Sequence, residues 1–204
     1  MRLNIFKTKN KIPDGYVIME VPFCTQLVDE SNFLTEGFES LGEGKKWSDN
    51  ICGLACLKMI IKRFFPKSDV NLSDLLKQGL KLGAYQEDSG WIHQGLINIA
   101  KYWGLLGKRE KFFSNLEKIA EQLLLGNLVV VSVTPGFEVE GNYSRGGHLV
   151  VVAGFVAKNN KVEKLIIHHP SSWKDYNWQN HEVDRKIFLK ATYKDGNMIV
   201  FYKK

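Results

Sequence analysis

The segment SDNICGLACLKMIIKRFFP, residues 48–66, carries the signals that decide the fold. From Leu54 onward its apolar side chains recur at i, i+3, i+4 and i+7, the periodicity of an amphipathic helix, and Pro66 ends the run. Residues 48–50 are Ser, Asp and Asn, which are types that cap helices, so we expect the helix to begin close to Cys52. The segment therefore predicts a cysteine at the N-terminus of a helix.

Around this helix the chain divides into a mainly helical half and a mainly extended half. A short strand is expected at residues 16–21 and a loop at residues 29–46. Further helices are expected behind Ser73, over residues 92–103, and behind a Ser114–Glu117 capping box. Apolar runs at residues 128–133, 148–156 and 162–168 predict strands covered on both faces, and a last strand is expected at residues 198–202. Residues 183–193 fit either a helix or a strand. Helices first and strands second indicate an α+β fold.

Length and composition favour one globular domain. The chain has 204 residues, of which 44% are hydrophobic and 25% charged. We expect a single domain over residues 1–204, with residues 1–15 as an extended or flexible N-terminus. The net charge is +6, but the excess is spread along the chain, and its densest run, residues 108–111, is interrupted by Glu110. We interpret these charges as solvated surface, so no nucleic-acid partner is expected.

The sequence carries none of the usual signs of export or membrane insertion. Its N-terminus lacks the apolar segment of a secretory signal, and no apolar run approaches the roughly 18 residues of a membrane span. Three cysteines are too few for a disulfide framework, so free thiols and a cytoplasmic location are expected. Export without a cleaved signal stays open.

Cys52 is the candidate nucleophile. A thiol at a helix N-terminus meets unpaired N–H groups and the positive end of the dipole, which favours the thiolate and lowers the pKa. Gly53 follows it, and the backbone N–H of Cys52 is suited to one half of an oxyanion hole. The alternative is that Cys52 is a small buried hydrophobe, as Cys24 and Cys56 are expected to be.

His148 is the candidate general base. Two glycines precede it and a hydrophobic strand follows, so its ring is held rigidly with one open side. His168 and His169 end another predicted strand. If the two strands are neighbours, only one of these adjacent side chains can meet His148, because alternate residues of a strand face opposite ways. His93 and His181 show no comparable setting, and no role is assigned to them.

Metal and cofactor motifs are missing from the sequence. It contains no C-x-x-C, no H-E-x-x-H, no Walker loop and no G-x-G-x-x-G. Cys52 and Cys56 have the spacing of a helical ligand pair, but Cys56 falls among core-facing leucines. Neither a metal nor a cofactor is expected.

Several segments, taken in order, resemble a known family. They are residues 21–26, Trp47 with Cys52-Gly53, Gly90-Trp91, the helix and strand at residues 116–133, the run 146–154 and the run 166–171. Their order and spacing are similar to those of the stand-alone relatives of the bacteriocin leader peptidases, clan CA family 39. The resemblance extends from about Tyr16 to Tyr202.

The resemblance implies a papain-like fold, in which a helical half carries the nucleophile at a helix N-terminus and packs on a twisted antiparallel sheet. It implies that Cys52 is the nucleophile and His148 the base. It also implies that Gln26 completes the oxyanion hole, and that His169 stands where the family has an Asp or Asn that orients the base.

Two positions depart from the family pattern. Leu54 replaces a common Pro, which costs little because Leu is a fair helix former. His169 replaces an acid or amide, and a neutral imidazole can accept a hydrogen bond but cannot stabilise an imidazolium as a carboxylate does. Asp175 and Asn177 are alternative sources of the third group.

The resemblance implies a cysteine peptidase that hydrolyses peptide or amide bonds in a peptide or protein substrate. The alternative is a weakly active or inactive module that binds peptides on the same fold. Related acyl transfer, such as transamidation, is a further option within the enzyme class. Cleavage after a double glycine, as in bacteriocin exporters, is not carried over, because the transporter portion is absent from this chain.

Overall fold

The computed structural model describes residues 11–134, 147–192 and 195–204. Its first half contains a short strand, four helices and a small hairpin: β1 Gly15–Ile18, α1 Leu41–Ser48, α2 Cys52–Phe64, α3 Leu72–Lys81, β2 Tyr85–Gln86, β3 Gly90–Trp91 and α4 His93–Tyr102. The second half is mainly strands: β4 Leu106–Lys111, α5 Glu117–Leu124, β5 Leu128–Val133, β6 His148–Lys158, β7 Lys161–His169, the 3₁₀ turn η2 Lys174–Tyr176, β8 Trp178–Asp184, α6 Arg185–Ala191 and β9 Asn197–Tyr202.

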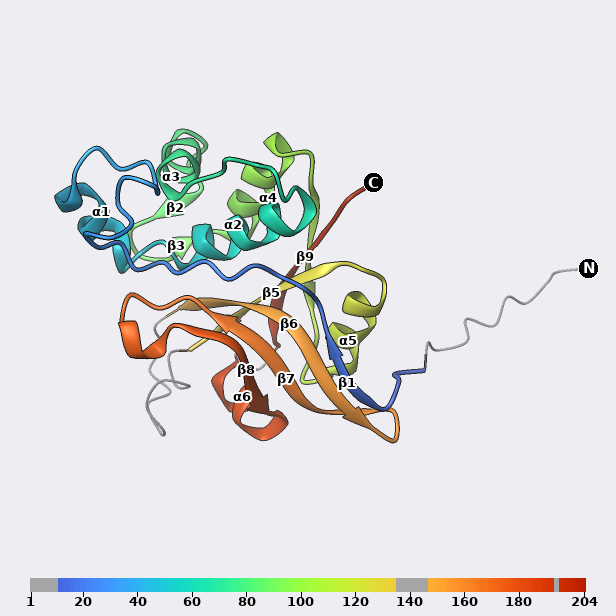
Figure 1. Ribbon diagram of the computed structural model, residues 1–204. Helices are drawn as coiled ribbons and strands as arrows, with labels where there is room; N and C mark the ends of the chain where they lie inside the picture. The colour runs from blue at the N-terminus through green and yellow to red at the C-terminus, as the bar shows by residue number, and fades with distance from the viewer. Residues whose placement is uncertain (1–10, 135–146, 193–194) are drawn as a thin grey trace, which may run out of the picture.

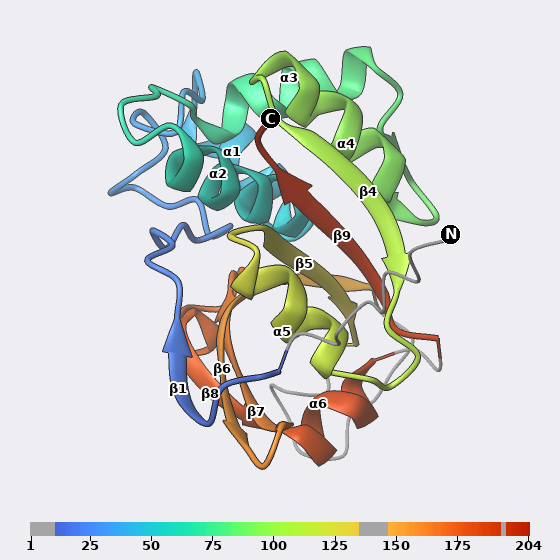
Figure 2. The ribbon, with the colours of Figure 1, turned by 90° about the vertical axis from the view of Figure 1, so that its right-hand side faces the viewer.

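One antiparallel sheet organises the molecule. Within the described residues it has seven strands in the order β4-β9-β5-β6-β7-β8, and β1 pairs with the far part of β6. The strand latest in sequence, β9, lies between β4 and β5 and hydrogen-bonds to both (Figure 2). The described strands nearest the two ends of the sequence, β1 and β9, thus belong to one sheet but are not neighbours in it.

The sheet separates two hydrophobic cores. Figure 1 shows α1–α4 gathered in one layer, with α5 and α6 on the other side of the sheet. Alternate residues of β5 serve the two cores: Leu128 and Val130 pack with the helical layer, whereas Val129 and Val131 pack toward α5 and α6. All six residues of β5 are buried, as the uninterrupted apolar run predicts.

The α+β class and the main strands are confirmed. The ambiguous stretch at residues 183–193 is strand only to Asp184 and then forms helix α6. The charged run at residues 108–111 is not merely solvated surface but part of the edge strand β4, paired with β9. Charged side chains suit an edge strand, because they protect its unpaired backbone groups from other chains.

Three local expectations are wrong. The predicted loop at residues 29–46 contains the start of α1, whose N-cap Ser40 accepts from the N–H of Glu43 while the Glu43 carboxylate accepts from that of Glu39. Helix α3 is capped by Asn71 rather than Ser73. Ser114 does not cap α5, because it adopts a φ of 61° before the helix begins.

The expected extended N-terminus lies partly outside the described residues, which start at residue 11. Ile12 is buried against the core that contains α5, and its N–H donates to Oδ1 of Asn160 at 2.7 Å. Residues from Ile12 onward are therefore anchored to the sheet.

Candidate active site

Cys52 is the first residue of α2, as the sequence predicts, although the cap differs from expectation. The N-cap is Ile51, which makes no side-chain cap bond. Ser48, expected as a cap, instead accepts from the N–H of Val28 and donates to the carbonyl of Gln26. Helix α2 thus begins without the side-chain cap that the residue types indicated.

Gly53 lets two side chains close around the start of α2. A Cβ at this position would lie 3.0 Å from Cβ of Trp91 and 3.1 Å from Cδ1 of Leu149. Trp91 is fixed by the hydrogen bond from its Nε1 to the carbonyl of Asn50, at 2.6 Å. The glycine therefore allows the indole and Leu149 to flank Cys52.

His148 is the first residue of β6 and lies opposite Val133 of β5. Gly147 precedes it and is exposed, with open space where a side chain would be. The Nε2 atom of His148 is buried and has no hydrogen-bond partner among the described residues. The ring is thus carried by a rigid strand, with one nitrogen available.

The two histidines at the end of β7 face opposite ways, as predicted. β7 is the neighbour of β6, and the ring centroids of His169 and His148 lie 4.5 Å apart with an angle of 39° between the rings. His168 points away: its Nε2 donates to the carbonyl of Val21 at 2.8 Å, and its Nδ1 accepts from the N–H of Asn180 at 3.0 Å. His169 is therefore the one that meets His148.

The neighbours of His169 are a carbonyl and an indole. Its Nδ1 donates to the carbonyl of Tyr176 at 2.7 Å, and its ring lies 5.1 Å from that of Trp178. The hydrogen bonds of the Asn177 side chain go to Thr25, Ser171 and Trp173, and Asp175 is exposed. His169 is thus the member of this group whose ring contacts His148.

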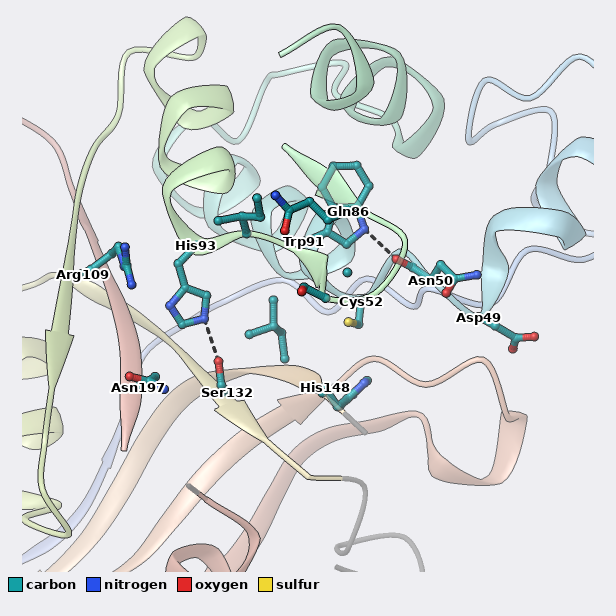
Figure 3. Close-up of a pocket in the computed structure, with 15 residues that line it drawn as sticks. Asp49, Asn50, Cys52, Gln86, Trp91, His93, Arg109, Ser132, His148 and Asn197 are labelled. Carbon is teal, nitrogen blue, oxygen red and sulfur yellow. Dashed lines mark hydrogen bonds between the residues drawn. The ribbon is translucent and has the colours of Figure 1, made fainter. Parts of the chain in front are cut away.

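Cys52 and His148 line the same cavity, which has a volume of about 460 Å³. Figure 3 shows the sulfur of Cys52 at the start of α2 and the imidazole of His148 at the start of β6. Most of the other lining residues were not predicted to belong to the site; they are Asp49, Asn50, Gln86, Ser89, Gly90, Trp91, Ile92, His93, Arg109, Ser132, Gly147, Leu149 and Asn197. A cavity of this size falls within the range of known ligand pockets, roughly 300–1,000 Å³.

With the fold and cavity described, similarity to known proteins identifies the family. The family model described as the peptidase C39-like family matches residues 18–197, which is most of the chain. This chain belongs to the peptidase C39-like family. No curated protein sequence matches it significantly.

A solved structure with a TM-score above 0.5 supports the fold. The peptidase domain of Streptococcus ComA, a bifunctional ABC transporter of a quorum-sensing pathway, has a TM-score of 0.54 at 19% identity, covering 76% of this chain and 93% of that domain. A double glycine motif protease from an AMS/PCAT transporter, in complex with its leader peptide, has a TM-score of 0.47 at 16% identity, covering 74% and 83%. The papain-like fold of the C39 peptidase domains, expected from the resemblance, is confirmed.

Against this family background, the electrostatics at Cys52 differ from the sequence expectation. Burial raises the pKa of the Cys52 thiol to about 11, although the backbone N–H groups of Leu149, Gly53 and Cys52 itself act to lower it. Burial also lowers the pKa of His148 to about 3; His169 acts in the same direction, and the carbonyl of Pro170 acts against it. Both groups are therefore neutral at pH 7, as thiol and imidazole.

Gln26, which the family resemblance assigns to the oxyanion hole, is buried beside the loop that leads into α2. Its Nε2 donates to the carbonyl of Ser48 at 2.8 Å, and its Oε1 is buried without a partner among the described residues. An amide nitrogen has two N–H donors, so this bond uses one of them. Gln26 is not among the residues that line the cavity.

The other cysteines pack, as predicted. Cys56 lies in the core beneath the cavity, where its thiol donates to the carbonyl of Leu149 at 3.3 Å. Cys24 is half-buried against the same core. Burial raises the pKa of both thiols.

Within residues 11–134, 147–192 and 195–204, no group of three or more His, Cys, Asp or Glu side chains is arranged to hold a metal ion. None of the helices in this part of the chain has the length and apolar composition that crossing a bilayer requires.

Proposed function

We propose that this chain is a cysteine peptidase that hydrolyses peptide bonds, with Cys52 as nucleophile and His148 as general base. The observation that carries the proposal is that one cavity is lined by a thiol at a helix start and by an imidazole whose buried Nε2 has no partner among the described residues. Membership of a peptidase family supports the reaction class.

In the proposed reaction, Nε2 of His148 takes the proton from Sγ of Cys52 as the sulfur attacks the carbonyl carbon. The new C–S bond gives a tetrahedral oxyanion, which the N–H of Cys52 and the second N–H of Gln26 Nε2 stabilise. The C–N bond then breaks, and the imidazolium gives its proton to the leaving amine. Water, deprotonated by His148, cleaves the thioester and releases the acid.

The neutral resting pair means that proton transfer accompanies the attack and does not precede it. His169 orients the imidazole through ring contact, and the Pro170 carbonyl favours the tautomer with a proton on Nδ1, which leaves Nε2 free to accept. Because a neutral His169 cannot offset the charge of an imidazolium as a carboxylate would, slow turnover is expected.

The test is cleavage of a proteome-derived peptide library, read by mass spectrometry. Cys52→Ala should lower cleavage by about 10³-fold or more, and His148→Ala by about 10²–10⁴-fold. Cys24→Ala is the matched control, because it removes a thiol that lies outside the cavity, and it should keep activity. Full activity in Cys52→Ala would sink the proposal.

A second candidate is a module that binds peptides without cutting them. The observation that favours it is the pair of pKa values, about 11 for Cys52 and about 3 for His148, which leaves both side chains uncharged. This candidate predicts that wild-type protein leaves every library peptide intact, and that wild type and Cys52→Ala retain the same peptides on a column.

A further inference from the structure

The cavity of Cys52 has a second, polar end built by four side chains from three strands and one helix. Arg109 comes from β4, Asn197 from β9, Ser132 from β5 and His93 from the first turn of α4. Figure 3 shows these four together on one side of Cys52, and Asp49 on the other side. We call the four the polar wall.

Arg109 is an unneutralised cation in this wall. Its side chain makes no ion pair or hydrogen bond with any residue in the described part of the chain, and its backbone pairs with β9. Two acids of this part of the sheet pair with lysines: Glu110 of β4 bonds to Lys108 at 2.6 Å, and Asp195, just before β9, bonds to Lys111. The guanidinium thus has its donors available to an occupant of the cavity.

One of the residues that line the cavity is acidic, and two more acidic residues lie in the nearby hairpin. Asp49 lines the end opposite Arg109, and Glu87 and Asp88 form the exposed tip between β2 and β3 without lining the cavity. The positive end and the negative end are thus separated by Cys52. An elongated ligand that crosses the cavity meets charges of opposite sign at its two ends.

The rest of the wall supplies neutral hydrogen-bonding groups. Nε2 of His93 and Oγ of Ser132 share a hydrogen bond of 2.7 Å, which fixes both side chains. Burial first, and then the charge of Arg109, lower the pKa of His93, so His93 is neutral at pH 7. Helix α4 begins here, and the positive end of its dipole adds to the field of Arg109.

We propose that the polar wall is a carboxylate-binding subsite that directs the enzyme toward peptides with an acidic group close to the scissile bond. The inference rests on the proposed function, since it treats the cavity as a peptide site. The groups of the wall match a carboxylate: a guanidinium can donate two parallel hydrogen bonds to it, and the amide of Asn197 adds a further donor. The carboxylate belongs either to an Asp or Glu side chain or to the C-terminus of the peptide.

The test measures binding and not cleavage, so it stays informative whatever the activity of Cys52. Cys52→Ala protein is titrated with blocked Ala–Gly octapeptides that carry one Glu, or one Gln, at each position in turn. NMR follows the imidazole signals of His93. At one position the Glu peptide should bind about 5-fold or more tighter than its Gln twin. It should also raise the pKa of His93, because the bound anion offsets Arg109.

Arg109→Gln should abolish the Glu preference and raise the pKa of His93 in the free protein. Lys108→Gln is the matched control: it removes the same charge from the adjacent residue of β4, which does not line the cavity, and should keep the preference. An unblocked peptide series separates the two sources, since a preference for the free C-terminus alone supports an exopeptidase subsite.

Equal affinity for the Glu, Gln and unblocked peptides would overturn the inference, as would the absence of binding by any of them. A Glu preference that survives Arg109→Gln would also overturn it. If the Glu preference holds but the wild-type protein cleaves no peptide of the proteome-derived library, the proposed peptidase activity is wrong and the carboxylate-binding subsite still stands.

Discussion

At the scale of single residues, Cys52 shows two physical effects in opposition. Its place at the start of α2 favours the thiolate, and three backbone N–H groups reinforce this preference. Burial of the sulfur away from water disfavours the thiolate more strongly than these groups favour it, so the pKa of Cys52 rises. The position of Cys52 at a helix N-terminus, taken alone, therefore predicts the wrong direction for the pKa shift of its thiol.

The alkylation rate of Cys52 by iodoacetamide should report this balance. Only the thiolate reacts, and the pKa is raised to about 11, so the rate should climb steadily with pH and reach no plateau below about pH 9. The modified residue is located by mass spectrometry. A plateau below about pH 8 that disappears in His148→Ala would instead indicate a thiolate–imidazolium pair and contradict the neutral resting state.

Stability in acid should depend on the buried histidines. Burial lowers the pKa of His148 to about 3 and that of His169 to about 4, whereas an unfolded histidine titrates near 6.5. Between these pKa values the unfolded chain binds more protons than the folded chain does. The free energy of unfolding is therefore at its highest above pH 6.5 and falls as the pH drops below that value.

Each of these two histidines contributes a slope of at most about 1.4 kcal/mol per pH unit. Urea unfolding between about pH 7 and about pH 4.5 measures the total slope. His148→Gln should make the slope shallower. An unchanged slope in this variant would show that His148 titrates alike in the folded and unfolded chains.

Gln26 should affect catalysis more than its packing explains. If its amide holds the oxyanion, Gln26→Ala lowers kcat by about 10²–10³-fold. Ser48→Ala is the control, since it removes the hydroxyl that bridges Val28 and Gln26 in the same loop but leaves the amide. The measurements are kcat/KM on a cleaved library peptide and Tm. Equal losses of activity in both variants would make Gln26 a purely structural residue.

The sequence predicts the residues whose setting is local and misses those that depend on distant pairing. Cys52 follows from the periodicity of its own helix, and the contact of His148 with His169 follows from two adjacent apolar strands. Arg109 joins the sheet of the cavity through the pairing of β4 with β9, which is far from it in sequence, and His93 is held there by its hydrogen bond to Ser132 of β5. Arg109 sits in a charged run whose usual explanation is solvent exposure.

At the scale of elements, α1 and β4 were missed for different reasons. The composition around α1 is rich in Gly and Glu, yet Ser40-x-x-Glu43 is a capping box that would have located its start. Edge strand β4 has mostly charged residues, so neither β propensity nor apolar alternation reveals it. The Ser114–Glu117 spacing matched a capping box by chance, because Glu117 serves a longer-range contact.

That contact makes Glu117 a junction between three elements. Its carboxylate accepts from the N–H of Val162 at 2.9 Å and from Arg185 at 2.7 Å, so it joins α5 to β7 and α6. Glu117→Ala should lower the free energy of unfolding by about 1–3 kcal/mol, because it leaves a half-buried guanidinium without its acid.

Glu121→Ala is the matched control for this junction. Glu121 lies one turn further along α5, and its side chain has no hydrogen bond or ion pair within the described residues. Urea denaturation should show little change in this control. A similar loss of stability in both variants would assign the effect to the helix and not to the junction.

At the scale of the whole molecule, the proposed nucleophile and the proposed base belong to different layers. Helix α2 packs in the helical core, and β6 belongs to the sheet, so the cavity lies where the layers meet. The order of elements was enough to predict an α+β class, and the family resemblance supplied the papain-like arrangement. No periodicity in the sequence specifies that β9 enters the sheet between β4 and β5. Periodicity indicates that a segment is a strand, whereas its neighbours depend on which strands compete to pair with the edges of β4 and β5.

The position of β9 has a consequence for biosynthesis. β4 pairs only with β9 in the described sheet, and 85 residues lie between Lys111 and Asn197. At roughly 5–20 residues per second, a ribosome needs on the order of 10 s to add them. A nascent chain arrested before residue 197 should be cut by trypsin after Lys108, Arg109 or Lys111, whereas the finished protein should resist. The proposed nucleophile and base are thus translated well before the wall that we propose selects a substrate is in place.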